Sequence, residues 1–173
     1  MWERHELILA ERKRPVAMND LIVMIDFICI ILLIYIAVTD MRKMIISNKV
    51  LAVLLVMSVI KQFLSAADIS SLLISTGIVI IIFTVLYYSV ENLIGGGDVK
   101  LIFVLSIWLG YPQVVVALYL AFIAGGIFAA FYLLFEHGKT VDKIAFAPFL
   151  VTGSLISLFE NEAVLNFWQM MTV

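Results

Sequence analysis

The stretch "VENLIGGGDVKLIF", Val90–Phe103, breaks a long apolar run with three consecutive glycines, an aspartate and a lysine. The apolar run resumes immediately afterwards. Glycine has no side chain, so its backbone can adopt positive φ and can come close to another chain. A carboxylate beside an apolar segment of membrane length is costly and usually functional. The stretch therefore predicts a break between two apolar helices, with Asp98 at the start of the second.

The rest of the chain is equally apolar. It has 173 residues, of which 64% are hydrophobic, and its mean hydropathy is +1.15. A soluble domain is about half apolar and arranges its apolar residues in amphipathic patterns, whereas here they form long unbroken runs. The single cysteine, Cys29, excludes an intrachain disulfide and a four-cysteine zinc site. The composition therefore indicates an integral membrane protein.

Six apolar segments can be distinguished, separated by loops of a few residues. A helix needs about 20 apolar residues to cross a bilayer, and the first, third and fifth segments reach or approach that length. We predict an all-α integral membrane protein with six transmembrane helices in one domain. The segments are roughly Leu21–Val38, Val50–Leu64, Ile69–Ser89, Val99–Leu109, Gln113–Phe135 and Ile144–Phe159.

Asp40 and Asp98 differ from the other carboxylates in their position. With six helices, the loops after the first and third helices lie on the same side of the membrane, so both aspartates sit at one face. Two carboxylates brought close cannot both ionise easily, so one holds a proton while the other can deprotonate a water molecule. This is the arrangement of an aspartic protease. A helix break with an interfacial aspartate cap explains the same residues, and the residues alone leave both interpretations open.

Other polar residues give weaker signals. Asp26 precedes Asp40 by fourteen residues, about 21 Å along a helix. That distance places it near the opposite interface, where we expect a solvated or snorkelling role. The two histidines, His5 and His137, stand alone, and no group of residues has metal-ligand spacing, so we expect no metal site.

The glycine-rich stretch resembles a motif of a known family, the type IV prepilin peptidases, which are GxGD-type intramembrane aspartic proteases. Gly95-x-Gly97-Asp98, followed by Lys100, is similar to the GxGDxK motif of that family. The stretch "DMRKMIISN" resembles the family's first aspartate motif, an Asp followed by an Arg and ending in Ile-Pro-Asn. The positions that fit are Asp40, Arg42, Ile46 and Asn48, while Ser47 stands where Pro is usual.

A third stretch, "KIAFAPFLVTG", resembles the Pro-Phe-Gly-Pro-Phe-Leu…Gly segment near the family's C-terminus. Ala145 and Ala147 replace the usual Pro and Gly. The positions that fit are Phe146, Pro148, Phe149, Leu150 and Gly153. In all, the resemblance spans about residues 21–160, and its departures from the family pattern leave the two aspartates unchanged.

The resemblance implies that Asp40 and Asp98 are catalytic. They would activate a water molecule and protonate the leaving amine. The implied substrate is a prepilin or pseudopilin whose positively charged leader precedes a hydrophobic helix. Cleavage would take place at the cytosolic face of the inner membrane. The expected partners are this substrate and the lipid bilayer, with no nucleic acid, no metal and no other cofactor.

The resemblance also implies roles for the residues around the aspartates. The glycines would let the backbone approach the substrate. Lys100 and Arg42 would either orient carboxylates or meet lipid headgroups, and we expect Asn48 to cap the second helix. The supporting motif residues are Gly95, Gly97, Lys100, Arg42, Asn48 and Pro148.

Long members of the family carry an added cytosolic zinc domain and methylate the new pilin N-terminus. Here the segment between Asp40 and the second helix is short and has no cysteine, so the chain resembles the short, peptidase-only type found with Flp/Tad pili. Two alternatives are the six-helix substrate-binding subunit of a vitamin transporter, which is not an enzyme, and the archaeal preflagellin peptidase.

The distribution of basic residues bears on the N-terminal segment. Cytosolic loops should hold the excess of Lys and Arg, but the two sides are nearly equal. The aspartate side has Arg42, Lys43, Lys49, Lys100, Lys139 and Lys143, and the other side has Arg4, Arg12, Lys13, Arg14 and Lys61. If the chain began at Met18, the aspartate side would have six basic residues and the other side one. We therefore expect residues 1–17 to be a dispensable extension, or else an amphipathic surface helix, and residues 18–173 to be the peptidase domain.

Overall fold

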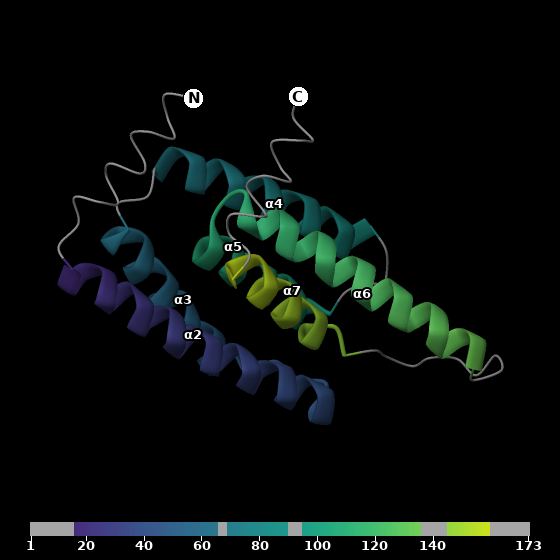
Figure 1. Ribbon diagram of the computed structural model, residues 1–173. Coiled ribbons are helices and arrows are strands. Elements are labelled where there is room, and N and C mark those ends of the chain that lie inside the picture. The colour runs from purple at the N-terminus through teal and green to yellow at the C-terminus, as the bar shows by residue number, and fades with distance from the viewer. Residues whose placement is uncertain (1–15, 66–68, 90–94, 136–144, 160–173) are drawn as a thin grey trace.

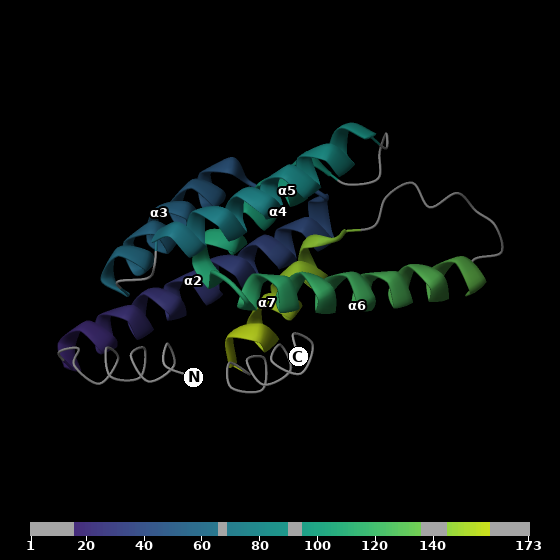
Figure 2. The same ribbon diagram turned by 90° about the horizontal axis from the view of Figure 1, so that it is seen from above.

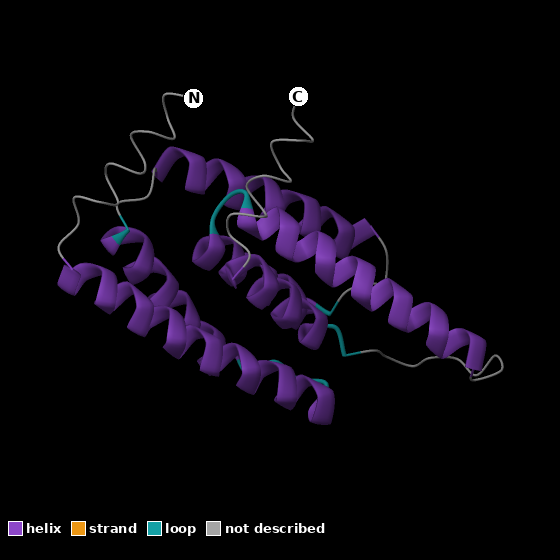
Figure 3. Cartoon of the chain, in the orientation of Figure 1, coloured by secondary structure: helices purple, strands orange, loops and turns teal. Residues whose placement is uncertain are grey.

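The computed structural model describes residues 16–65, 69–89, 95–135 and 145–159, and these residues form helices joined by short connections (Figures 1 and 3). The prediction of an all-α fold is confirmed for this part of the chain. Residues 1–15, the bulk of the predicted N-terminal extension, lie outside it. The six helices are α2 (Val16–Lys43), α3 (Asn48–Leu64), α4 (Ile69–Ser89), α5 (Gly96–Leu109), α6 (Gln113–Phe135) and α7 (Ala147–Phe159).

The helix boundaries match the apolar segments closely for α4 and α6 and differ for the helices that carry the aspartates. α2 continues past Val38 to Lys43, so that Asp40 lies in its last turn. α5 begins at Gly96 rather than Val99, which places Asp98 in its first turn. It ends at Leu109, and the next residue, Gly110, has a φ of 70°, which suits the residue that follows a helix.

The start of the last helix also differs from the prediction. α7 begins at Ala147, three residues after the predicted start at Ile144, and the carbonyl of Phe146 accepts its first backbone hydrogen bonds. Pro148 is the second residue of α7. Proline fits the first turn of a helix because N–H groups there have no partner within the helix.

Within the part of the chain that the structure describes, two helices are long and apolar enough to cross a bilayer. They cover Met18–Lys43 and Gln113–Tyr132, with mean hydropathies of 3.1 and 2.5, while the apolar stretches Leu72–Val85 and Ala147–Phe159 are shorter. Large apolar side chains also face outward along several helices. Phe27, Ile31, Phe63, Leu73 and Phe135 are each more than half exposed. A contiguous apolar surface of this kind is unusual on a soluble monomer and is compatible with contact to lipid.

The centre of the bundle is α5, which packs against α3, α4, α6 and α7. Leu101, Leu105 and Trp108 are almost fully enclosed. α2 packs against α3 and α7 (Figures 1 and 2). α6 and α7 approach each other closely at Gly153, where an added Cβ would collide with the carbonyl oxygen of Ala117. This packing brings together the end of α2 and the starts of α5 and α7.

Candidate active site

Asp40 is held at the junction of α2 and α7. Its side chain is only 6% exposed, and its Oδ2 accepts a hydrogen bond from the backbone N–H of Ala147 at 3.1 Å. Ala147 is the first residue of α7, and Pro148 after it has no N–H to offer. The positive end of a helix dipole favours a negative charge placed there. The start of α7 therefore binds and orients the Asp40 carboxylate.

Asp98 is held by the first turn of its own helix. The backbone N–H of Gly95, the residue that precedes α5, donates to its carboxylate, which is one half of a capping box. The other oxygen, Oδ1, is buried and has no hydrogen-bond partner among the described residues. One oxygen is thus stabilised as an anion, and the other is left without a donor.

The two carboxyl groups interact electrostatically. Asp98 precedes the apolar part of α5. Burial, and then the charge of Asp40, raise the pKa of Asp98 to about 6, while the Gly95 hydrogen bond lowers it. A contribution from Asp40 requires the two groups to be near each other. The structure thus brings together the two aspartates that the sequence predicted to share one membrane face.

The glycines serve close packing rather than an unusual backbone conformation. Gly95 has a φ of −68°, and Gly110 is the only glycine with positive φ in the described part of the chain, so positive φ is not what this stretch requires. A Cβ on Gly95 would lie 2.9 Å from Oδ2 of Asp98, and one on Gly97 would lie 3.2 Å from Cβ of Ile46. The missing side chain of Gly95 leaves room for the Asp98 carboxylate, and that of Gly97 lets the loop after α2 pack against the start of α5.

One expectation for the supporting residues is wrong. Asn48 does not cap α3, because the capping position is Ser47, whose side chain makes no capping hydrogen bond. Instead the Oδ1 of Asn48 accepts a hydrogen bond from Nζ of Lys100 at 3.1 Å. Lys100 thus joins the first turn of α5 to the start of α3, and Arg42 is exposed at the end of α2.

The prediction for Asp26 is also wrong. It is not a solvated side chain but forms an ion pair with Lys61 at 2.7 Å, in the N-terminal half of α2. Two opposite charges within apolar helices were a signal for this pairing. No comparable signal existed for Ala147, because its backbone N–H contacts Asp40 and its side chain does not.

Comparison with known proteins agrees with this geometry. Residues 27–130 match the type IV leader peptidase family, and this range includes both aspartates. A prepilin leader peptidase/N-methyltransferase of Bacillus subtilis (strain 168) is 28% identical over 144 residues, which are 79% of this chain and 56% of that protein. One from Legionella pneumophila is 35% identical over 75 residues, 43% of this chain and 26% of that protein.

The chain spans about half the length of the Bacillus relative and about a quarter of the Legionella relative. No solved structure matches it. The family match nonetheless covers more than half of the 173 residues, and it includes the two aspartates that the fold brings together. The chain therefore belongs to the type IV leader peptidase family.

Proposed function

We propose that this protein is an aspartic endopeptidase that removes the positively charged leader from a type IV prepilin or pseudopilin. The observation that carries the proposal is the coupled pair Asp40 and Asp98, placed at two helix ends within the region that matches the family. The relatives from Bacillus subtilis and Legionella pneumophila both bear the name prepilin leader peptidase/N-methyltransferase, which supports the same substrate class.

The proposed mechanism uses one proton shared by the pair. A coupled pair titrates as a unit, but its surroundings favour Asp98 as the protonated member, because its pKa is raised to about 6 and its Oδ1 has no donor. Asp40, bonded to the Ala147 N–H, acts as the base. It takes a proton from a water molecule whose oxygen attacks the scissile carbonyl, and Asp98 donates its proton as the amine leaves.

The proposed location is the inner membrane, with six crossing helices and the aspartates at the cytosolic face. The exposed apolar side chains and the two long apolar helices support a membrane setting. Arg42 and Lys43 in the last turn of α2 and Lys100 in the first turn of α5 are exposed basic residues on the aspartate side. They support the cytosolic face if the chain begins at Met18, since that side then has six basic residues against one.

The substrate follows from this placement. A leader with positive charge would remain at the cytosolic face, while the hydrophobic helix behind it stays in the bilayer and presents the junction to the aspartates. The vitamin transporter alternative is not favoured, since it leaves the match to the peptidase family unexplained. The archaeal preflagellin peptidase is likewise not favoured, because both curated relatives are bacterial prepilin peptidases by name.

The test is cleavage of candidate prepilins by the purified protein in lipid vesicles, with the cut mapped by mass spectrometry. Asp40→Asn and Asp98→Asn should each lower the cleavage rate by at least about 100-fold while the protein still inserts and accumulates. Asp20→Asn is the matched control, because Asp20 is an exposed carboxylate near the other end of α2. Wild-type turnover in either the Asp40 or the Asp98 variant would refute the catalytic pair.

A further inference from the structure

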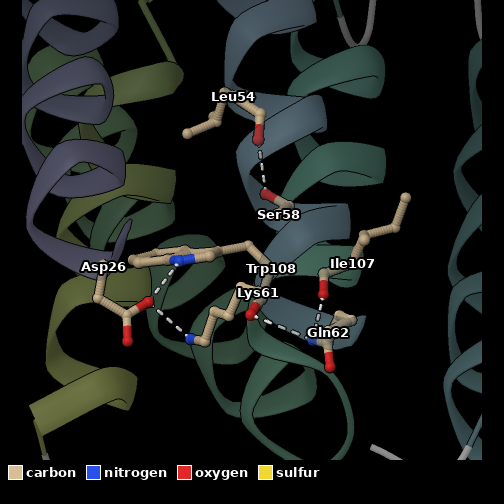
Figure 4. A network of polar contacts seen from close by, with 7 residues as sticks. All are labelled: Asp26, Leu54, Ser58, Lys61, Gln62, Ile107 and Trp108. Atoms are coloured by element: carbon tan, nitrogen blue, oxygen red, sulfur yellow. Dashed lines mark hydrogen bonds and ion pairs between the residues drawn. The ribbon is translucent and has the colours of Figure 1, made fainter. Parts of the chain in front are cut away.

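A cluster of polar side chains joins the C-terminal ends of α3 and α5 to the N-terminal half of α2 (Figure 4). The Oδ1 of Asp26 in α2 forms the ion pair with Lys61 in α3. The same oxygen accepts a hydrogen bond from the indole N–H of Trp108 in α5 at 2.9 Å. Trp108 is fully enclosed, and the side chains of Lys61 and Asp26 are 13% and 20% exposed.

Within this cluster, two successive residues of α3, Lys61 and Gln62, make the polar contacts with α2 and α5. The Lys61 ammonium lies 5.3 Å from the centre of the Trp108 ring, a distance at which the ring attracts a cation. The side-chain amide of Gln62 donates to the carbonyl of Ile107 and, at 3.4 Å, to that of Trp108. These carbonyls belong to the last turn of α5, where the helix itself provides no donor. We call Asp26, Lys61, Gln62 and Trp108 the Asp26 cluster.

The helices joined by the Asp26 cluster are also the helices that carry the catalytic pair. α2 has Asp26 in its N-terminal half, ten residues after its start, and Asp40 in its last turn, fourteen residues or about 21 Å further on. α5 has Asp98 in its first turn and Trp108 ten residues later, about 15 Å away. The two helices run in opposite directions, so Asp26 meets Trp108 at one end and Asp40 approaches Asp98 at the other.

A continuous helix of this length transmits an axial shift from one end to the other. Catalysis is sensitive to such shifts, and a displacement of about 1 Å can cost about 100-fold in rate. A buried ion pair, in contrast, contributes little net stability compared with apolar residues of similar size. The Asp26 cluster is therefore better explained by position than by stability.

We propose that Asp26, Lys61 and Trp108 are positioning residues that fix the axial register of α2 against α5 and so hold Asp40 and Asp98 at working distance. The hydrogen bond from Trp108 to Asp26 sets the register, and Lys61 holds the carboxylate in place. The inference rests on the proposed peptidase function for its catalytic consequence.

Two double variants separate the hydrogen bond from the charges. Asp26→Leu with Lys61→Met removes both charges and the acceptor for Trp108. Asp26→Asn with Lys61→Met removes the same charges but keeps an acceptor oxygen. We expect kcat per folded molecule to fall about tenfold in the first variant, with KM within about twofold, and to return near the wild-type value in the second.

Ser58→Ala is the control for altering a buried polar group nearby. Ser58 is enclosed in α3, and its hydroxyl donates to the carbonyl of Leu54 within the same helix at 2.7 Å. We expect its kcat to remain at the wild-type value. Equal kcat in the two double variants would overturn the proposal, because a purely structural role does not depend on the acceptor at position 26.

A second readout does not require cleavage. Ile46→Cys and Gly97→Cys, in a Cys29→Ala background, place two thiols where the loop after α2 meets α5, since a Cβ on Gly97 would lie 3.2 Å from that of Ile46. Oxidation should cross-link the two thiols readily in the protein with the wild-type cluster and in the Asp26→Asn, Lys61→Met variant. Cross-linking should be weaker in the Asp26→Leu, Lys61→Met variant. Equal cross-linking would overturn the register proposal. Failure of the wild-type protein to cut any prepilin would instead count against the proposed function.

Discussion

Two features of its surroundings raise the pKa of the Asp98 carboxyl. The residue is partly buried and lies near the charge of Asp40, and together burial and this charge raise its pKa from 3.8 to about 6. Because the two groups titrate as a pair, the raised pKa of Asp98 extends to higher pH the range in which the pair keeps a proton. A water-activating pair needs one base and one acid at the same time, so the raised pKa keeps the acid available closer to neutral pH.

The pH dependence of cleavage follows from this residue. As pH rises through about 6, Asp98 loses the proton that the leaving amine requires, so kcat/KM should fall by about tenfold per pH unit. The measurement is kcat/KM for one prepilin across the range on both sides of that value, in vesicles that remain intact. A flat profile from mildly acid to alkaline pH would contradict the assignment of Asp98 as the acid.

A titration without substrate tests the coupling itself. Asp40→Asn removes the negative charge that raises the pKa of Asp98, so the pKa should fall; because burial is the larger cause, it should stay above 3.8. The infrared band of the protonated carboxyl, assigned by its loss in Asp98→Asn, reports this titration. Asp20→Asn should leave the band unchanged. An Asp98 titration that is identical with and without Asp40 would mean that the two groups do not interact.

At the scale of elements, the sequence predicted helices well where apolar runs end at clear breaks. α4 and α6 match their predicted bounds because loop residues close each run. α2 is longer than predicted because Thr39, Asp40 and Arg42 continue the helix although they are polar. Hydropathy alone cannot distinguish such a continued helix from a loop. The contact between Ala147 and Asp40 was beyond prediction, since a backbone N–H leaves no trace in the sequence.

α7 approaches α6 closely at Gly153. A Cβ on Gly153 would collide with the backbone of Ala117, so Gly153→Ala should push α7 away and withdraw the Ala147 N–H from Asp40. We expect a loss of about 1–3 kcal/mol in stability and slower cleavage. Gly126→Ala in α6 is the control, because its added Cβ has nothing within 4 Å.

Thermal unfolding in detergent and the cleavage rate of the folded fraction measure the two effects separately. If Gly153→Ala behaved like Gly126→Ala in both assays, the close crossing of α6 and α7 would not be what places α7 against Asp40.

For the molecule as a whole, the sequence predicted which residues share an end of the bundle but not what aligns them. Six helices in order were enough to place Asp40 and Asp98 on one face. The contact of Asp26 with Lys61 and Trp108 depends on how α2, α3 and α5 are rotated about their axes. A segment that is apolar on every side carries no information about that rotation. The sequence therefore predicted that the two aspartates lie together, but it did not predict the Asp26 cluster.

The short connection between α2 and α3 bears on whether the product is methylated. It consists of Met44–Ser47, with no cysteine, in the place where long members of the family are implied to carry a zinc domain and to methylate the pilin. We expect this protein to release pilin with an unmethylated N-terminus even when S-adenosylmethionine is present. Mass spectrometry of the product measures it, with the Bacillus subtilis relative, named as both peptidase and N-methyltransferase, as the positive control. A methyl increment on the new N-terminus, reproduced with Asp98 intact and absent without S-adenosylmethionine, would show that the zinc domain is not needed for the second activity.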